Sequence, residues 1–146
     1  MVGVPLTGSV ALLWAGLALG GNVIAASAKF QVPDLSNQIL FQIGRAQFGW
    51  LAVAEWSLLA IYCLGWLMLS RFAALLCTVP VLATLGQQLW LIPLLNQRTD
   101  MVVAGQLPPE SNIHLVYVFV ELTKIAWLLG VGIFLCRQGS VRAEVG

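Results

Sequence analysis

The sequence predicts an all-α integral membrane protein, a four-helix bundle with antiparallel up-down-up-down connections. The chain has 146 residues, of which 60% are hydrophobic and 9% are charged, with a mean hydropathy of +0.91. A soluble domain carries about 25% charged residues. The apolar residues also form blocks long enough to cross a hydrocarbon core of about 30 Å at 1.5 Å per residue. Such blocks must be helices, because only an intrasegment ladder satisfies the backbone of each block in lipid.

Four spans are predicted in one transmembrane domain covering residues 1–146, at about 8–29, 46–69, 72–95 and 113–136. Only Leu69–Phe72 separate the second and third spans, which predicts a tight antiparallel hairpin. The longer connections, 30–43 and 96–112, then share one side of the membrane, the loop side, and both termini lie on the other, the termini side. The first block is interpreted as a span and not as a signal peptide, because residues 2–13 contain no Lys or Arg.

Orientation depends on a small charge difference. Lys and Arg are equally frequent on the two sides, with Lys29, Arg45 and Arg98 on the loop side and Arg71, Arg137 and Arg142 on the termini side. The loop-side cations are matched by Asp34, Asp100 and Glu110, whereas the termini side has only Glu144. The three cysteines lie nearer the termini side, which suits a reducing compartment. We therefore expect both termini to lie in the cytoplasm.

Composition and motifs exclude several functions. A net charge of +1 provides no basic field for nucleic acid. Cys63, Cys77 and Cys136 form no metal-binding spacing, and a single histidine, His114, cannot build a multi-histidine metal or haem site. No catalytic triad or phosphate loop is present. The sequence favours a non-enzyme and identifies no cofactor or metal. The predicted partners are the lipid bilayer and further membrane subunits, as a homo-oligomer or a larger complex.

The tryptophans partly fit two interfacial belts. Trp14 and Trp66 are predicted near the termini-side surface, and Trp50 and Trp90 near the loop-side surface. Trp56 and Trp127 fall near the middle of the bilayer, where an indole N–H requires a partner.

The most informative pattern is a layer of polar residues inside the spans. Counted from the loop-side end of each span, six polar residues from four helices fall roughly 10–17 Å below the surface. They are Asn22, Glu55, Gln87, Gln88, Glu121 and Lys124. Charged groups at such depth are costly unless they face the bundle interior and are paired. We therefore predict that these six residues form an intramembrane site for a small ligand, an ion or a proton.

The layer contains two carboxyl groups and one ammonium group. Glu121 and Lys124 are three residues apart, so they can pair on one helix face. Glu55 is then either protonated, paired with Lys124 as well, or compensated by a bound cation or donor-rich ligand. On the same stripe as Glu121, His114 and Tyr117 are candidate gating or lining residues, together with Trp56 and Trp127. On the first span, the Gly16 and Gly20 spacing predicts close helix approach.

Other interpretations of the layer remain open. It could be a hydrogen-bonded staple that fixes helix register, or a contact to another subunit, which would make the chain an accessory or assembly subunit. A ligand site predicts a solvent-reachable cavity at this depth, open through the loop side. The stretches 36–43 and 98–105, partly apolar and partly polar, are candidate interfacial segments that lie over the layer as a lid.

Residue patterns along nearly the whole chain resemble small bacterial four-span inner-membrane proteins of unknown function. The resembling segments are Gly20–Ala26, Lys29-Phe30, Gly44–Phe48 with Glu55, Gln88–Pro93, and His114–Tyr117 with Glu121 and Lys124. This resemblance implies a family and no activity.

A weaker resemblance is to the membrane-associated glutathione and eicosanoid enzymes, four-span chains of similar length. Arg45-Ala46-Gln47 is similar to the motif that opens their second helix. Gly49 and Ala52 stand where that motif has Asn and Glu, so most glutathione-binding positions are absent. The resemblance implies a glutathione-transferase-like enzyme as an alternative function.

Overall fold

The computed structural model describes residues 3–144, and the side chains of residues 3–139, as a bundle of four long antiparallel helices. The charges of Arg142 and Glu144, which entered the orientation count, therefore lie outside the described side chains. The first rod, Gly3–Gln31, consists of α1 (Gly3–Ala18), the π-helical η1 (Leu19–Ala25), α2 (Ala26–Ala28) and the 3₁₀ turn η2 (Lys29–Gln31). The second rod is α3 (Asn37–Trp66).

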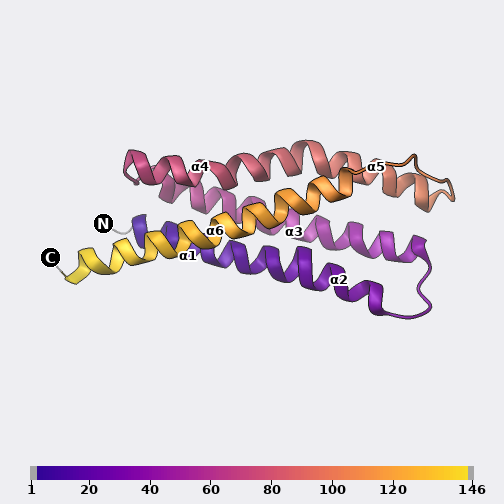
Figure 1. Cartoon of the computed structure of the whole chain (residues 1–146), viewed down its shortest axis with the longest axis horizontal. Coiled ribbons are helices and arrows are strands. Elements are labelled where there is room, and N and C mark those ends of the chain that lie inside the picture. The colour runs from indigo at the N-terminus through magenta and orange to yellow at the C-terminus, as the bar shows by residue number, and fades with distance from the viewer. Residues whose placement is uncertain (1–2, 145–146) are drawn as a thin grey trace.

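The third rod, Arg71–Val103, consists of α4 (Arg71–Gly86), the π-helical η3 (Gln87–Leu91) and α5 (Ile92–Val103), and the fourth is α6 (Ile113–Glu144). Both termini lie at one end of the bundle and the two longer connections at the other (Figure 1). All four rods are long and apolar enough to cross a membrane, so the predicted all-α membrane bundle is confirmed.

The rods extend further on the loop side than the apolar blocks predicted. α3 begins at Asn37, where Ser36 caps it by accepting from the backbone N–H of Ile39, and α5 ends at Val103, just before Gly105 adopts a φ of +74°. The stretches 36–43 and 98–105 are therefore mainly the ends of spanning helices, and the lid prediction is wrong. Hydropathy locates only the part of a helix that lies in lipid, whereas capping residues set where the helix ends.

Glycines of α1 and α6 meet at a close contact between these two helices. A Cβ atom on Gly8 would lie 3.1 Å from the carbonyl oxygen of Gly132, and a Cβ on Gly132 would lie 3.1 Å from that of Gly8. Gly16 and Gly20, by contrast, have open space where a Cβ would point. The prediction of a close approach at Gly16 and Gly20 is therefore wrong. The contact on α1 is at Gly8 instead, because the Gly16 face of α1 does not pack against α6.

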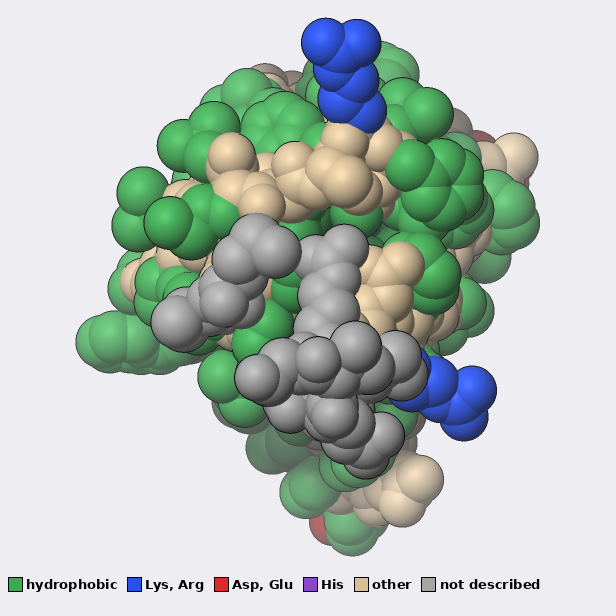
Figure 2. All heavy atoms as spheres, turned by 90° about the vertical axis from the view of Figure 1, so that its left-hand side faces the viewer, with side chains coloured by type: hydrophobic (Ala, Val, Ile, Leu, Met, Phe, Trp, Pro, Cys, Tyr) green, Lys and Arg blue, Asp and Glu red, His purple; other side chains and the backbone are tan. Residues whose placement is uncertain are grey.

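The hydrophobic core occupies the termini-side part of the bundle. Its fully buried members include Ala11, Ala15, Leu128 and Leu135, from the same two helices that the glycines bring together. Large apolar side chains cover the outer surface, and at the termini end two basic side chains project from a mostly hydrophobic surface (Figure 2). Burial of small residues inside and exposure of large apolar residues outside is the arrangement expected of a bundle in lipid.

Two rods contain a π-helical turn, and both turns lie at the depth of the polar residues. η1 includes Asn22, and η3 begins with Gln87 and Gln88. Isolated π-helical turns inside α-helices are frequent at functional sites, because the wider turn redirects side chains. Both turns therefore bear directly on the geometry of the polar layer.

Candidate functional site

Lys124 lies at the centre of the polar layer. Its Nζ donates to Glu55 Oε1 at 2.6 Å and to Gln87 Oε1 at 2.9 Å, and lies 2.9 Å from Glu121 Oε2. An ammonium group has three hydrogens, so all of them have an acceptor. The structure thus pairs Lys124 with both carboxyl groups, which is one of the arrangements that the sequence left open for Glu55.

Glu55 reaches the cluster from α3. Its Oε1 accepts from Lys124 and from the indole Nε1 of Trp14 at 3.2 Å, and its Oε2 accepts from Gln88 Nε2 at 3.0 Å. Both carboxyl oxygens therefore have donors, from three different helical rods.

Glu121 has an equivalent set of donors. Its Oε1 accepts from Asn22 Nδ2 at 2.9 Å, and its Oε2 accepts from Gln87 Nε2 at 2.7 Å beside the ammonium group of Lys124. The other amide atom of Asn22, Oδ1, is buried without a hydrogen-bond partner. Asn22 therefore has a buried acceptor that is not used.

The four central residues of the cluster are sealed from solvent, whereas Asn22 and Gln88 are half-buried, so the solvent-reachable cavity expected of a ligand site is not found among the central residues. The exposed fractions of Glu55, Gln87, Glu121 and Lys124 are 2%, 1%, 2% and 1%. At such burial the ion pairs gain strength from the low dielectric, but the desolvation of three charged groups opposes that gain. What distinguishes this cluster is its charge composition, two carboxyls to one ammonium, with nearly every polar atom paired.

The π-helical turns aim the amide side chains at these charges. Gln87 and Gln88 are consecutive residues, yet one bonds to Glu121 and the other to Glu55. They sit in η3, whose wider turn changes the angle at which successive side chains project. In η1 the carbonyl oxygen of Gly21 accepts a short hydrogen bond from the side chain of Gln47. The two turns thus direct polar side chains into the bundle interior. The turn η1 also leaves one backbone carbonyl, that of Gly21, to accept from a side chain of α3.

The sequence missed Trp14 as a member of the cluster and placed it in an interfacial belt. The structure buries its side chain completely, with the ring centroid 6.0 Å from Lys124 Nζ. Because α1 begins at Gly3 and not near residue 8, Trp14 lies about 17 Å along the helix. The available signal was its spacing of eight from Asn22, which places both residues on one helix face.

The remaining candidate residues lie outside the cluster. Tyr117 is 4% exposed and stacks edge-on against Phe48 with ring centroids 5.7 Å apart, and His114 is exposed one turn further out. Trp56 is 41% exposed, and Trp127 lies on the outer surface, where its Nε1 donates to the carbonyl of Leu76. The structure therefore brings together the six predicted polar residues and Trp14, but not these four. Among the described residues, no group of three or more acidic, histidine or cysteine side chains is placed to hold a metal ion.

Comparison of the chain with models of protein families, with curated proteins and with solved structures finds no match.

Proposed function

We propose that this membrane protein binds and exchanges one proton at the cluster of Glu55, Glu121 and Lys124. The observation that carries the proposal is the charge composition of a sealed site, in which two carboxyl groups share one ammonium group. With both carboxylates ionised, the cluster has a net charge of −1 inside the membrane. A net charge at that depth costs several kcal/mol, and one added proton removes it.

A proton is favoured over a metal ion or a small molecule because it needs no room. The position between the two carboxyl groups, where a cation would bind, is filled by the Lys124 ammonium group. Each carboxyl oxygen already accepts a hydrogen bond from a protein donor. A larger ligand would have to displace these donors, whereas a proton needs only a change in one hydrogen bond.

Asn22 supports Glu121 as the carboxyl group that receives the proton. An asparagine amide has a donor and an acceptor that exchange places when the amide rotates. With Glu121 ionised, Asn22 donates to Oε1 and its own Oδ1 has no partner. With Glu121 protonated at Oε1, a rotated amide accepts from the new O–H. Gln87 cannot rotate in this way, because its oxygen accepts from Lys124 and its nitrogen donates to Glu121.

Infrared spectroscopy of the full chain in liposomes tests the proposal, because a protonated carboxyl group has a C=O stretch distinct from that of a carboxylate. We expect one such band, and we expect it to shift in D₂O. Glu121→Gln and Glu55→Gln should each abolish it, since either change leaves one carboxylate with one ammonium group. Glu110→Gln, at an exposed position in the loop, is the matched control and should leave the band unchanged.

A second variant tests the role of Asn22. Asn22→Leu removes the rotating amide and should shift the frequency of the band without abolishing it. A spectrum of the wild type with no protonated-carboxyl band, or a band that persists in both glutamate variants, would contradict the proposal. The cluster would then act as a structural staple between the helices.

We also infer a location in the bacterial inner membrane with both termini in the cytoplasm. The resemblance to small bacterial four-span proteins supports the location. Support for the orientation comes from the excess of arginine over acidic residues in the sequence at the termini end, and from the position of the three cysteines nearer that end. Alkaline phosphatase fused after the C-terminus should be inactive, and phosphatase inserted after the exposed Leu107 should be active. The reverse pattern would overturn the orientation.

A further inference from the structure

The close-packed hydrophobic core lies on one side of the proton site. Every buried member of that core is nearer the termini end than the polar residues that the same rod contributes to the cluster. On the loop side, Leu91 and Tyr117 are the only buried hydrophobic residues in the part of the chain that the structure describes. A core packed at the density of an organic crystal has few voids that could hold water. The two routes from the cluster to the membrane surfaces are therefore unequal.

Tyr117 is the neighbour of the cluster on the loop side. It precedes Glu121 by four residues on α6, which places the two Cβ atoms about 5–6 Å apart on one face of the helix. Its side chain is buried and lies within electrostatic range of the carboxyl groups of Glu121 and Glu55. A phenolic hydroxyl group both donates and accepts hydrogen bonds. Tyr117 can therefore take a proton from one partner while it gives its own proton to another.

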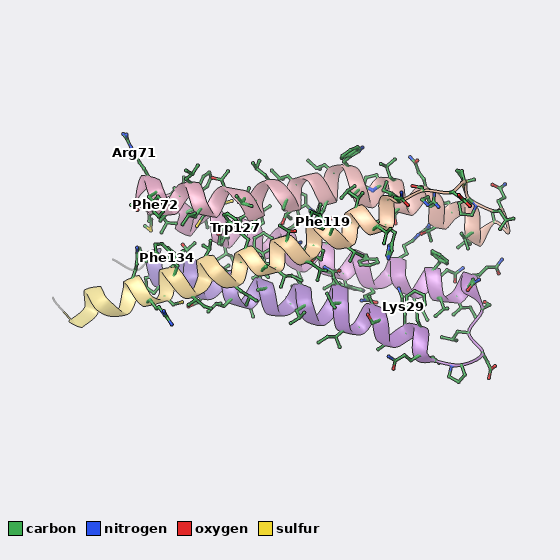
Figure 3. All side chains as sticks on the ribbon, viewed as in Figure 1. Lys29, Arg71, Phe72, Phe119, Trp127 and Phe134 are labelled. Carbon is green, nitrogen blue, oxygen red and sulfur yellow. The ribbon has the colours of Figure 1, made fainter. Side chains whose placement is uncertain are left out.

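Two contacts link Tyr117 to Lys29. The ring of Phe48 meets that of Tyr117 edge to face with centroids 5.7 Å apart, and Lys29 Nζ lies 5.7 Å from the centroid of the Phe48 ring. Lys29 belongs to the loop-side end of the first rod, at the opposite end of the bundle from Arg71 (Figure 3). A continuous series of contacts thus runs from the loop-side end of the bundle to the neighbour of Glu121.

Gly44 makes room for the ammonium group of Lys29 beside α3. A Cβ atom on Gly44 would lie 2.5 Å from Lys29 Nζ. Lys29 is half-buried, and it takes part in no salt bridge among the described side chains. An ammonium group is strongly hydrated, so water that solvates Lys29 comes close to the ring of Phe48. The rings of Phe48 and Tyr117 are then the barrier between that water and Glu121.

On the termini side, the cluster contacts a group that cannot pass a proton on. The indole Nε1 of Trp14 donates to Glu55 Oε1, and the ring of Trp14 meets that of Tyr62 with centroids 5.8 Å apart. An indole nitrogen donates a hydrogen bond but does not accept one. Trp14 therefore offers no relay from Glu55 to the hydroxyl group of Tyr62, which lies in the buried core.

We propose that the cluster exchanges its proton with the loop side of the membrane alone, and that Tyr117 relays this proton. Such exchange presupposes that the cluster binds a proton, as proposed above. A hydronium ion on the loop side protonates the Tyr117 hydroxyl group as that group gives its own proton to Glu121, and water remains. The reverse sequence releases the proton. A site open to one side senses the protons of that compartment and cannot conduct them across the bilayer.

Stopped-flow infrared spectroscopy of the full chain in liposomes tests the relay, through the rate at which the protonated-carboxyl band shifts after mixing with D₂O. Water crosses the lipid itself, so D₂O reaches both surfaces, and the effect of each variant shows which route the exchange uses. Tyr117→Phe should slow the exchange about 100-fold, the lower end of what one positioned proton-transfer group typically contributes.

Tyr62→Phe is the matched control. Tyr62 is the only other tyrosine of the chain and is also buried, but on the termini side. This substitution should leave the exchange rate unchanged. Thr84→Val removes a second buried hydroxyl group on that side and should also leave the rate unchanged.

A pair of cavity-forming variants tests the barrier. Phe48→Ala removes the ring that covers Tyr117 and should speed the exchange. Leu59→Ala removes a buried apolar side chain one helical turn from Glu55 on the termini side, and should leave the rate unchanged. Liposomes that contain the wild type and a pH-sensitive dye, under a potassium diffusion potential, should take up protons no faster than liposomes without protein.

The outcomes separate this proposal from proton binding itself. A wild type without the band would contradict proton binding, and the one-sided route with it. With the band present, an unchanged exchange rate in Tyr117→Phe, or proton uptake driven by the potential, would overturn the one-sided route alone. So would slower exchange in Tyr62→Phe or Thr84→Val. Faster exchange in Leu59→Ala with an unchanged rate in Phe48→Ala would place the route on the termini side.

Discussion

The indole Nε1 of Trp127 donates to the carbonyl oxygen of Leu76 at 2.8 Å, across the interface between α6 and α4. That carbonyl would normally accept from the backbone N–H of residue 80, but residue 80 is a proline, which has none. Trp127 therefore supplies the donor that Pro80 removes, at a depth where no water can do so.

Trp127→Phe should lower the free energy of unfolding by about 1 kcal/mol, the usual net value of one hydrogen bond. In a Pro80→Ala background, the backbone N–H of residue 80 can again donate to the Leu76 carbonyl. Trp127→Phe should then lower the free energy of unfolding markedly less. Reversible unfolding of the four proteins in mixed micelles gives the coupling energy of the cycle. Equal costs in both backgrounds would show that the indole does not act through the Leu76 carbonyl.

Lys124→Met should be the most destabilising substitution in the cluster. It removes the positive charge from between Glu55 and Glu121 while leaving both carboxyl groups buried, and breaking a buried pair in this way costs about 3–5 kcal/mol. The comparison is Lys29→Met, because Lys29 is only half-buried and contacts the rings of Phe30 and Phe48. The free energies of unfolding of the two variants should differ by at least about 2 kcal/mol, and similar values would contradict the paired geometry.

The neighbouring residues Gln87 and Gln88 should contribute unequally to the free energy of unfolding. Gln87 bonds to both Lys124 and Glu121, whereas the hydrogen bond of Gln88 in the cluster goes to Glu55 alone. Hydrogen bonds to charged groups contribute about 1.5–3 kcal/mol each. Gln87→Leu should therefore lower the free energy of unfolding about twice as much as Gln88→Leu. The prediction fails if thermal unfolding in detergent ranks the two variants in the opposite order.

Close packing of α1 against α6 makes glycine necessary at one position of α6 and unnecessary two residues earlier. A Cβ on Gly132 would lie 2.7 Å from Leu12 Cγ and 3.1 Å from the carbonyl oxygen of Gly8, so Gly132→Ala should cost about 1–3 kcal/mol through overpacking. Gly130→Ala should be nearly neutral, because its Cβ meets open space. Melting temperatures of the two variants in the same detergent compare them directly. Equal melting temperatures would mean that the helices can separate without penalty.

The ion pair between Arg45 and Asp100 should contribute little to the free energy of unfolding. Its atoms are 2.6 Å apart, but the two side chains are 39% and 67% exposed. Exposed ion pairs contribute about 0–1 kcal/mol and weaken with salt. Arg45→Gln should thus change the free energy of unfolding by less than about 1 kcal/mol, and by less still at high ionic strength. A loss that does not fall as salt is added would show that the hydrogen bond from Arg45 to the Asn96 carbonyl dominates instead.

Depth counting from the sequence found the six polar residues that the structure brings together, because a transmembrane helix rises by a fixed distance per residue. It could not give their partners. Whether Lys124 bonds to one carboxyl group or two depends on the rotation of α3 relative to α6, which the depth of a residue in the membrane does not determine. Trp14 was misplaced for a related reason, since an error of one turn in the start of a helix changes an interior residue into an interfacial one.

The π-helical turns could not be predicted from hydrophobic periodicity, which assumes one angular step throughout a helix. These turns affect how one half of a helical rod is rotated about the rod's axis relative to the other half. In the first rod, the termini-side half is fixed against α6 at Gly8, and the loop-side half is fixed against Leu51 of α3 at Gly21. In a uniform α-helix, the rotation of one half about the helix axis would determine the rotation of the other half. The wide turn at Leu19–Ala25, which contains Gly21, changes the angular step between these two contacts, so the packing at Gly8 does not fix the orientation of the chain at Gly21.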